Sequence, residues 1–332
     1  MNLKNKDFIF TAFGVSGREE QVRNEIERFV GSRVDEIVHD ATGSLICRKK
    51  GRGSRRIMIS AHMDTIGFVI THIDERGFLR FAEVGGQVEV YLLGRRVIFE
   101  DGRIGVIGIE KLEKGKVLQK ERMFIDIGAR SMKEAASQVR IGDMCAVYAP
   151  YAVTDRIITG GWMDDRIGCF VLLEVIETLK DTPNDLYFVF SAQEEVGLRG
   201  ATTTAYRIEP HIGIAVDVTF SSDLPEGDRI GSSVLGKGVA VKFMDQSVIV
   251  PRKLARYLVS LAEKRGIPHQ HDIIRRGGTD AHAMQLSRGG SLAGGISIPA
   301  RYIHSSGEMC ALDDVQACID LASAVCRDNM KV

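Results

Sequence analysis

Two adjacent carboxylates, Glu194 and Glu195, follow an apolar run at 186–190 that is typical of a buried central strand. Catalytic loops of open α/β sheets lie at the carboxyl ends of such strands. Neighbouring carboxylates repel each other, and burial raises the cost of keeping both charged, so the pair favours a bound cation or a shared proton. An exposed acidic turn would show the same two residues, and the pair alone does not decide between these interpretations.

A histidine and an aspartate close a second apolar run as His62-Met-Asp64. A strand with this ending can place the imidazole on a metal ion while the carboxylate accepts the other ring proton. A surface histidine is the alternative interpretation. Asp164 and Asp165 begin an apolar helix, where the helix dipole favours negative charge, so simple capping also explains this pair.

Two further residues complete the set. Asp217 lies inside the apolar run 212–218, where a carboxylate is costly unless a ligand pairs with it, and His304 follows a strand predicted at 292–299. Two histidines and several carboxylates suit Zn²⁺, Co²⁺ or Mn²⁺, and the cysteines show no metal-binding spacing. The ligands exceed what one catalytic zinc ion uses, so they favour a pair of metal ions about 3.5–4 Å apart.

The composition argues against several classes of partner. The chain has 332 residues, 44% of them hydrophobic, and its 44 Lys and Arg residues balance 44 Asp and Glu residues. The length fits one large domain and a smaller one. A balanced charge favours neither nucleic acid nor an acidic membrane surface. No apolar run reaches the roughly 18 residues of a membrane span, and the cysteine pattern suits a reducing cytoplasm.

The pattern of helices and strands divides the chain. Residues 1–66 and 151–332 alternate helical and apolar strand patterns, which predicts an α/β catalytic domain. Residues 67–150 predict an inserted β-barrel or sandwich with one short helix at 131–138. Its short β-like runs are 68–73, 78–82, 88–92, 96–99, 105–109, 123–127 and 144–148. The insert has no cluster of His, Asp or Glu, so we expect it to mediate assembly or to fence the site.

Two local patterns in the α/β part carry structural predictions. Ser16 and Glu19 have the spacing of a capping box for a helix that ends at Gly31. Asp280 and His282 follow a glycine pair, and they either line the substrate pocket or belong to the capped start of a helix.

Taken together and in order, the candidate residues lie in motifs of one known family. The motifs are Ala61-His-Met-Asp64, Asp164-Asp-Arg-Ile-Gly168, Gln193-Glu-Glu-Val-Gly-Leu-Arg-Gly200, Val216-Asp217-Val-Thr219, Gly277-Gly-Thr-Asp-Ala281 and Arg301-Tyr-Ile-His304-Ser. Over essentially its whole length, the chain resembles the cytosolic tetrahedral (TET) aminopeptidases, the glutamyl aminopeptidase or "cellulase M"-like dinuclear metallopeptidases. The resemblance implies a mixed-sheet, zinc-exopeptidase-like catalytic domain with an inserted all-β, barrel-like domain.

The resemblance also implies a metal site with two divalent ions per subunit, zinc foremost and cobalt or manganese as alternatives. His62 and Asp217 resemble the ligands of one ion, and Glu195 and His304 resemble those of the other. Asp164 resembles the carboxylate that bridges the two ions.

Two catalytic roles follow from the same resemblance. Glu194 corresponds to the general base, and Asp64 to the residue that orients His62. We therefore expect a cytoplasmic aminopeptidase that removes N-terminal residues from short peptides. The insert is expected to make the dimer contacts of a hollow homododecamer.

Two other functions share these residues. A dinuclear deacylase or carboxypeptidase would use the same ligands, although an insert between His62-Met-Asp64 and Asp164 favours the aminopeptidase. A non-catalytic assembly protein would be indicated by loss of a ligand or of the base, and all of them are present. Phe220, where many relatives carry histidine, and the lysine-rich segment 110–120 leave the preferred N-terminal residue and the assembly details open.

Overall fold

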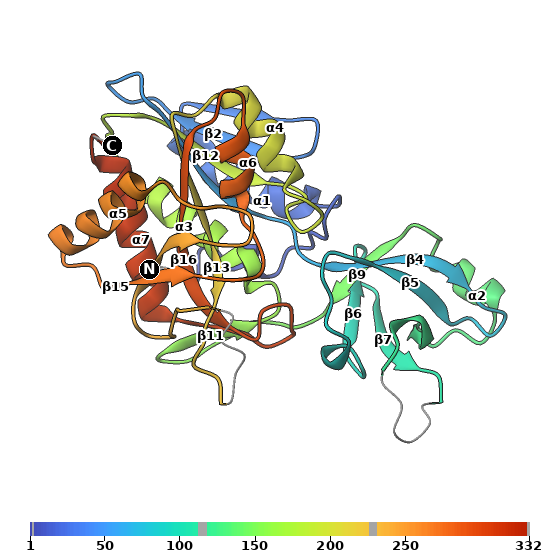
Figure 1. Ribbon diagram of the computed structural model, residues 1–332. Helices are drawn as coiled ribbons and strands as arrows, with labels where there is room; N and C mark the ends of the chain where they lie inside the picture. The colour runs from blue at the N-terminus through green and yellow to red at the C-terminus, as the bar shows by residue number, and fades with distance from the viewer. Residues whose placement is uncertain (2, 112–117, 226–230, 331–332) are drawn as a thin grey trace.

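The computed structural model describes residues 1, 3–111, 118–225 and 231–330, which form a large α/β body and a smaller β-barrel (Figure 1). The barrel projects from one side of the α/β body. The helices are α1 Glu20–Val30, α2 Met132–Ala136, α3 Met163–Thr178, α4 Arg199–Ile208, α5 Arg252–Arg265, α6 Asp280–Leu286 and α7 Leu312–Arg327.

A mixed sheet forms the centre of the α/β body. Its strands are β1 Glu36–His39, β2 Leu45–Lys49, β3 Arg56–His62, β10 Ala152–Val153, β11 Ile157–Gly160, β12 Asp185–Ser191, β13 Ile212–Phe220, β14 Val239–Met244, β15 His269–Ile273, β16 Leu292–Arg301 and β17 Glu308–Ala311. They follow the order β1-β2-β12-β3-β13-β16-β17-β11-β10, with β14 paired to β16 and β15 to β14. The central strands β12, β3, β13 and β16 run parallel, so their carboxyl ends meet at one edge.

Helices cover both faces of this sheet (Figure 1). α3, α5 and α7 pack on one face, and α4 and α6 pack on the other. α3 is buried almost all round because α1, α7 and the sheet enclose it. The central parallel strands are therefore buried on both sides, which explains their near-continuous apolar sequences.

The barrel closes in the order β4-β5-β8-β7-β6-β9, and closure leaves it no free sheet edge. Its strands are β4 Gly67–Ile73, β5 Leu79–Val84, β6 Arg96–Phe99, β7 Ile104–Ile109, β8 Met123–Asp126 and β9 Met144–Val147. Its interior is an apolar cluster of its own, which includes Phe68, Leu79, Val97 and Ile125. The expected fold class, a mixed-sheet α/β body with an inserted barrel, is confirmed.

One predicted strand of the barrel is wrong. Residues 88–92 form a tight 3-10 turn, Glu89–Tyr91, in which the backbone oxygen of Val88 accepts a hydrogen bond from the amide of Tyr91 at 2.9 Å. Val90 of this run is 67% exposed, whereas Leu92 is buried in the apolar interior of the barrel. The lysine-rich segment 110–120 lies largely outside the described residues.

The predicted capping box is also wrong, whereas the short barrel helix is confirmed. α1 begins at Glu20, and no side chain caps its start. The hydroxyl of Ser16 instead donates a hydrogen bond to Asp64 at 2.6 Å. In α2, Ser131 accepts the backbone N–H of Glu134, as its sequence pattern predicts. Within the described ranges, no helix combines the length and hydropathy needed to cross a membrane.

Candidate active site

The carboxyl ends of the central parallel strands converge on one cavity of about 310 Å³. The predicted ligands and the predicted base line it together: His62, Asp164, Glu194, Glu195, Asp217 and His304. β3 ends at its histidine and β13 carries its aspartate, whereas the glutamates and the second histidine come from the loops after β12 and β16. Parallel pairing of these strands is what brings together residues that are far apart in the sequence.

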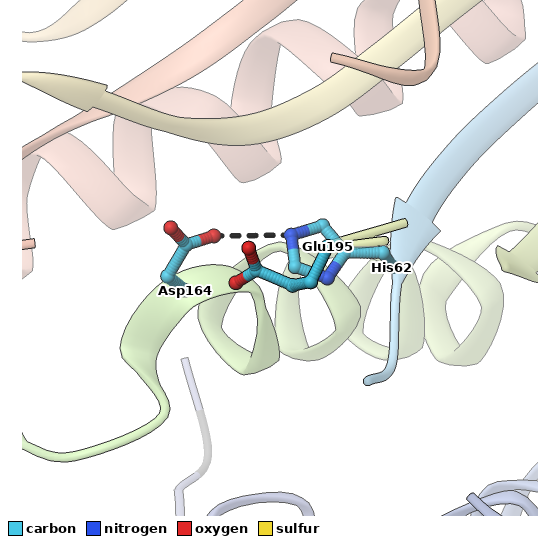
Figure 2. Close-up of side chains that lie close together, drawn as sticks. All are labelled: His62, Asp164 and Glu195. Carbon is cyan, nitrogen blue, oxygen red and sulfur yellow. Dashed lines mark hydrogen bonds and ion pairs between the residues drawn. The ribbon is translucent and has the colours of Figure 1, made fainter. Parts of the chain in front are cut away.

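Asp164, at the start of α3, lies between the two histidines. Its Oδ1 is 3.0 Å from Nε2 of His62, and its Oδ2 is 3.4 Å from Nε2 of His304. Nε2 of His304 is also 3.4 Å from Oε1 of Glu195. Figure 2 shows the side chains of His62, Asp164 and Glu195 pointing toward one another. The carboxylate of Asp164 thus presents one oxygen to each histidine.

Two groups of potential ligand atoms lie close enough to hold a cation. One group combines His62 with Asp164 and Glu195, and the other combines His62 with Asp165 and Asp217, with the atoms of each group within 4.8 Å of one another. Sequence reasoning did not assign Asp165 as a ligand. It is fully buried, and its Oδ2 has no hydrogen-bond partner among the described residues. Its place in the Asp-Asp pair is the signal that could have indicated it.

The cavity holds more buried carboxylates than its histidines can neutralise. Burial raises the pKa of Glu194 and of Asp217 well above the usual range, and neighbouring carboxylates raise both further. Desolvation alone would lower the pKa of His304, but Glu195 and Asp164 raise it to about 12. Oε1 of Glu195 is buried without a hydrogen-bond partner among the described residues. Such a cluster fits bound cations, because positive charge relieves the repulsion.

Asp64 joins the end of β3 to the loop that carries the glutamates. Its carboxylate accepts hydrogen bonds from the Ser16 hydroxyl at 2.6 Å and from the backbone N–H groups of Glu194 at 3.0 Å and Glu195 at 3.2 Å. Nδ1 of His62 lies 3.1 Å from the backbone oxygen of Asp64 and 3.4 Å from its Oδ1. These contacts direct Nε2 of the ring into the cavity.

Glu308 supports the site from β17, although no sequence pattern indicated it. Its carboxylate accepts hydrogen bonds from the backbone N–H of Asp164 at 3.1 Å and of His304 at 2.7 Å. Burial raises the pKa of Glu308 to about 8, and the nearby charge of Asp164 contributes to this rise. One buried acid thereby fixes the two loops that deliver a carboxylate and an imidazole to the cavity.

Asp280 is buried and does not line the cavity. Its Oδ2 accepts hydrogen bonds from the hydroxyls of Ser60 and Ser191, which lie near the ends of β3 and β12. Thr279 provides the cap at the start of α6. Among the described residues that line the cavity, neither Asp280 nor His282 is present. Of the two interpretations of this motif, the capped helix start is the one that fits.

The barrel reaches the cavity through the turn after β5. A Cβ atom on Gly86 would lie 3.5 Å from ring atoms of His304, and one on Gly85 would lie 3.2 Å from Cβ of Glu195. Gly85 also has a φ of +77°, which other residues rarely adopt. Gln87 follows and lines a small cavity of about 20 Å³ together with Glu195 and His304. The barrel is therefore part of the wall around the site.

Strained backbone accompanies several of these loops. Trp162, Gln193 and His304 have φ values of +68°, +57° and +63°, a region that side-chain-bearing residues seldom occupy. Trp162 lies two residues before Asp164 and Gln193 directly before Glu194, and His304 itself lines the cavity. Backbone strain of this kind concentrates at functional sites, where the surrounding structure over-determines it.

Comparison with known proteins identifies the family. Residues 43–321 match the M42 glutamyl aminopeptidases. The chain belongs to this family. Among its relatives, the lysyl aminopeptidase of Pyrococcus furiosus is 35% identical over 327 residues, which cover 94% of this chain and 93% of that protein. The resemblance inferred from the sequence motifs is thereby confirmed.

Solved structures of the family share the whole fold. An aminopeptidase from the archaeon Desulfurococcus kamchatkensis is 39% identical and superposes with a TM-score of 0.93 over 98% of this chain and 94% of its own. The TET1 peptidase of Pyrococcus horikoshii, which assembles into a tetrahedron or a large octahedral shell, is 34% identical with a TM-score of 0.88. That match covers 98% of this chain and 99% of the other.

Proposed function

We propose that the protein is a metal-dependent aminopeptidase that removes N-terminal residues from short peptides. Membership of the M42 family supports the class of reaction. The observation that carries the proposal is the position of Asp164 between His62 and His304, in a cavity lined by further carboxylates. A buried cluster of acids opposes folding unless cations or protons neutralise it, so its presence argues for a functional use.

The side chains of the cavity fit two divalent ions. We infer that His62 and Asp217 hold one ion and that Glu195 and His304 hold the other, with Asp164 shared between them. Imidazole nitrogens and carboxylate oxygens suit zinc, cobalt and manganese alike. When bound, such a pair of ions acidifies a water molecule and polarises the carbonyl group of the scissile bond.

Glu194 is the proposed general base. It lines the cavity with Oε2 3.9 Å from Nε2 of His62, yet it belongs to neither group of close ligand atoms. A carboxylate that stays free beside the ligands can accept the proton of the attacking water and return it to the leaving amine. Asp64 keeps His62 oriented and holds the backbone N–H of Glu194, so it acts as a positioning residue.

The charge of the cavity favours substrates with a free α-amine. The ammonium group of an unmodified N-terminus is a cation with three hydrogen-bond donors, and the carboxylates of the cavity offer complementary acceptors. An N-acyl amino acid has neither the charge nor these donors. This complementarity supports an aminopeptidase over a deacylase that uses the same ligands.

Two neighbouring substitutions test the proposal. Glu194→Gln should keep the bound metal and lose kcat by a factor of about 10³ or more, because only the proton acceptor is removed. Glu195→Gln is the matched control and should lose metal as well as activity. Hydrolysis of aminoacyl-p-nitroanilides and of N-acyl amino acids, together with elemental analysis, gives both readouts. Unchanged turnover in Glu194→Gln, or faster hydrolysis of the N-acyl compounds, would contradict the proposal.

We also propose that residues 67–150 form an assembly domain and that the chains build a shell of twelve subunits. Large apolar side chains are exposed on the barrel at Val88, Val90, Leu93, Ile104, Val106, Met132 and Ile141. Exposed apolar side chains in this number on one small domain fit a surface that packs against another subunit. The tetrahedral and octahedral shells of the Pyrococcus horikoshii TET1 peptidase support this arrangement. Native mass spectrometry should give the mass of twelve chains, and a monomer at micromolar concentration would contradict it.

A further inference from the structure

We propose that the cavity selects peptides whose N-terminal side chain is apolar and uncharged. This inference rests on the proposed function and names the substrate class of the same site. Beyond the proposed ligands and the base, the described residues that line the cavity carry no charged side chain. Its apolar lining comes from Leu198, Val218, Phe220, Ile274 and Ile303.

Phe220 and a glycine pair define one wall of this apolar region. Phe220 ends β13, is partly buried, and lines the cavity directly beyond the strand segment that carries Asp217. A Cβ atom on Gly277 would lie 3.8 Å from the Phe220 ring, so the backbone of this glycine faces the aromatic side chain. Gly277 brings no side chain of its own, which leaves room beside the ring for a substrate side chain.

The charges of the cavity do not favour a basic substrate side chain once metal is bound. The carboxylates that line it are Asp164, Glu194, Glu195 and Asp217. All four are inferred metal ligands or the base, and the described residues of the apolar wall carry no charge to pair with a lysine side chain. An unpaired ammonium group that leaves water there carries the full cost of desolvation.

An acidic substrate side chain lacks a partner as well. Arg275 and Arg276 lie in the chain between Ile274 and Gly277, but both side chains are exposed to solvent and neither lines the cavity. A glutamate side chain packed against Phe220 would therefore be buried without a cation. The described residues of the apolar wall thus offer no charged partner for a glutamate side chain.

The second cavity at the site is too small to take the side chain instead. It lies on the barrel side, is lined by Gln87 and Trp162, and has a volume of about 20 Å³. That is room for about one water molecule. A side chain of the size of leucine or methionine fits only the larger cavity, whose walls away from the metal ligands are apolar.

A substrate panel tests the selectivity. The metal-loaded full chain should hydrolyse the p-nitroanilides of leucine and methionine fastest. Those of lysine and glutamate should show kcat/KM values lower by about 100-fold or more, because an unpaired charge must be buried. A lysine or glutamate substrate that equals or exceeds leucine would overturn the inference. Hydrolysis of none of the aminoacyl compounds would instead overturn the proposed function, so the two failures are distinguishable.

A substitution at the apolar wall tests where the substrate side chain lies. Phe220→Asp places a carboxylate at the apolar wall and should raise the ratio of kcat/KM for lysine over leucine by about 10-fold or more. Tyr206→Asp makes a similar replacement at an aromatic residue on α4 that is 56% exposed and does not line the cavity. The ratio should not change in this control.

Metal content separates a local effect from misfolding. Phe220→Asp should bind as much metal per chain as the parent protein. An unchanged lysine-to-leucine ratio at full metal content would show that Phe220 does not border the N-terminal side chain, and would overturn the inference. If Phe220→Asp loses metal, Phe220→Ser replaces it and should lower kcat/KM for leucine about 10-fold while that for alanine changes less. An equal loss for both substrates would also overturn the inference.

Discussion

The α/β body and the barrel treat polar side chains in opposite ways. In the barrel, charged residues pair near the surface, as Arg80 does with Glu110 at 2.5 Å and Lys120 with Glu83 at 2.7 Å. Gln87 is the one polar side chain that is buried among the described residues of the barrel. Its interior is otherwise apolar, and several of its apolar side chains face outward. The barrel is thus built around its own apolar core, and its outward apolar side chains are where we propose contacts between subunits.

The α/β body instead buries acids at one edge of its sheet. Asp64 and Asp165 are fully buried, and Asp217 is 7% exposed in an otherwise apolar strand. Isolated buried carboxylates would oppose folding, so the acids of this edge lower the stability of the folded chain. The side chains that could carry the chemistry are therefore concentrated where the fold accepts a loss of stability. The two regions meet where the backbone of Gly86 approaches the ring of His304, close enough that an added Cβ atom would touch it.

The largest effects are expected at the acidic edge. His62→Ala and Asp164→Asn each remove an inferred ligand, so both should lose metal and lower kcat/KM by several orders of magnitude. Arg80→Ala on the barrel breaks an ion pair near the surface and should change stability by about 1 kcal/mol or less. Elemental analysis and hydrolysis rates compare the three. A barrel variant that loses as much activity as the ligand variants would break the contrast between the regions.

The sequence predicted the residues that line the cavity better than the residues that hold them in place. Ligand types and their places at strand ends follow from apolar runs that stop at His62 or precede Glu194, because parallel strands deliver their ends to one edge. Glu308 was missed because its role is to accept two backbone N–H groups that become neighbours only after folding. Ser16 was misread as a helix cap because a distant carboxylate, that of Asp64, competes for its hydroxyl.

The same reasoning explains the errors in the barrel. The run 88–92 has the apolar composition of a strand, yet its backbone turns, so that Val90 faces outward while Leu92 is buried. A pattern of apolar residues does not distinguish burial in the same chain from burial against another one. The approach of the barrel to His304 was not predicted either, because the absence of a side chain at Gly86 carries no chemical signal in a single sequence.

An intermediate effect is expected where the two regions meet. Gly86→Ala adds a Cβ atom at an ordinary contact distance of 3.5 Å from the His304 ring and should be tolerated. Gly86→Val adds two further methyl groups, which must displace the ring, so metal affinity and kcat/KM should fall about 10- to 100-fold. Metal titration and kinetics measure the pair. Equal behaviour of the two variants would show that the barrel does not position this histidine.

A smaller effect on activity is expected from the outer surface of the barrel. Val90 and Leu93 are 67% and 46% exposed, and the double substitution Val90→Glu with Leu93→Glu places charges where we propose contacts between subunits. Assembly should be lost, while each chain keeps its metal and most of its activity on a single-residue substrate. Native mass spectrometry and kinetics test this. An intact assembly would place the contacts elsewhere.

Stability rather than activity is expected to change at Glu19, a buried acid behind the loop that carries Glu194 and Glu195. Glu19 accepts hydrogen bonds from the backbone N–H groups of Gly17 and Gln193, and burial, helped by the charge of Asp64, raises its pKa to about 7. This folded value exceeds the ordinary value of 4.5, so the stabilisation that comes from the protonated form is complete below pH 4.5 and is lost as the pH rises to 7.

Glu19→Gln removes this titration while it keeps an oxygen acceptor. Relative to the parent, the variant should therefore gain stability between pH 5 and pH 8, by about 2–3 kcal/mol. Glu83→Gln on the barrel surface serves as the control and should show little change. Chemical denaturation of the metal-free proteins at both pH values checks the difference. A parent that gains stability relative to Glu19→Gln over this interval would contradict the assignment.

Metal analysis of the purified, active protein tests most directly whether the cavity binds two divalent ions. We expect two divalent ions per chain, with anomalous diffraction peaks on either side of the Asp164 carboxylate, and the same two ions in Glu194→Gln despite its loss of turnover. Full hydrolysis of aminoacyl substrates by a chain stripped of metal, or ions bound away from His62 and His304, would contradict it.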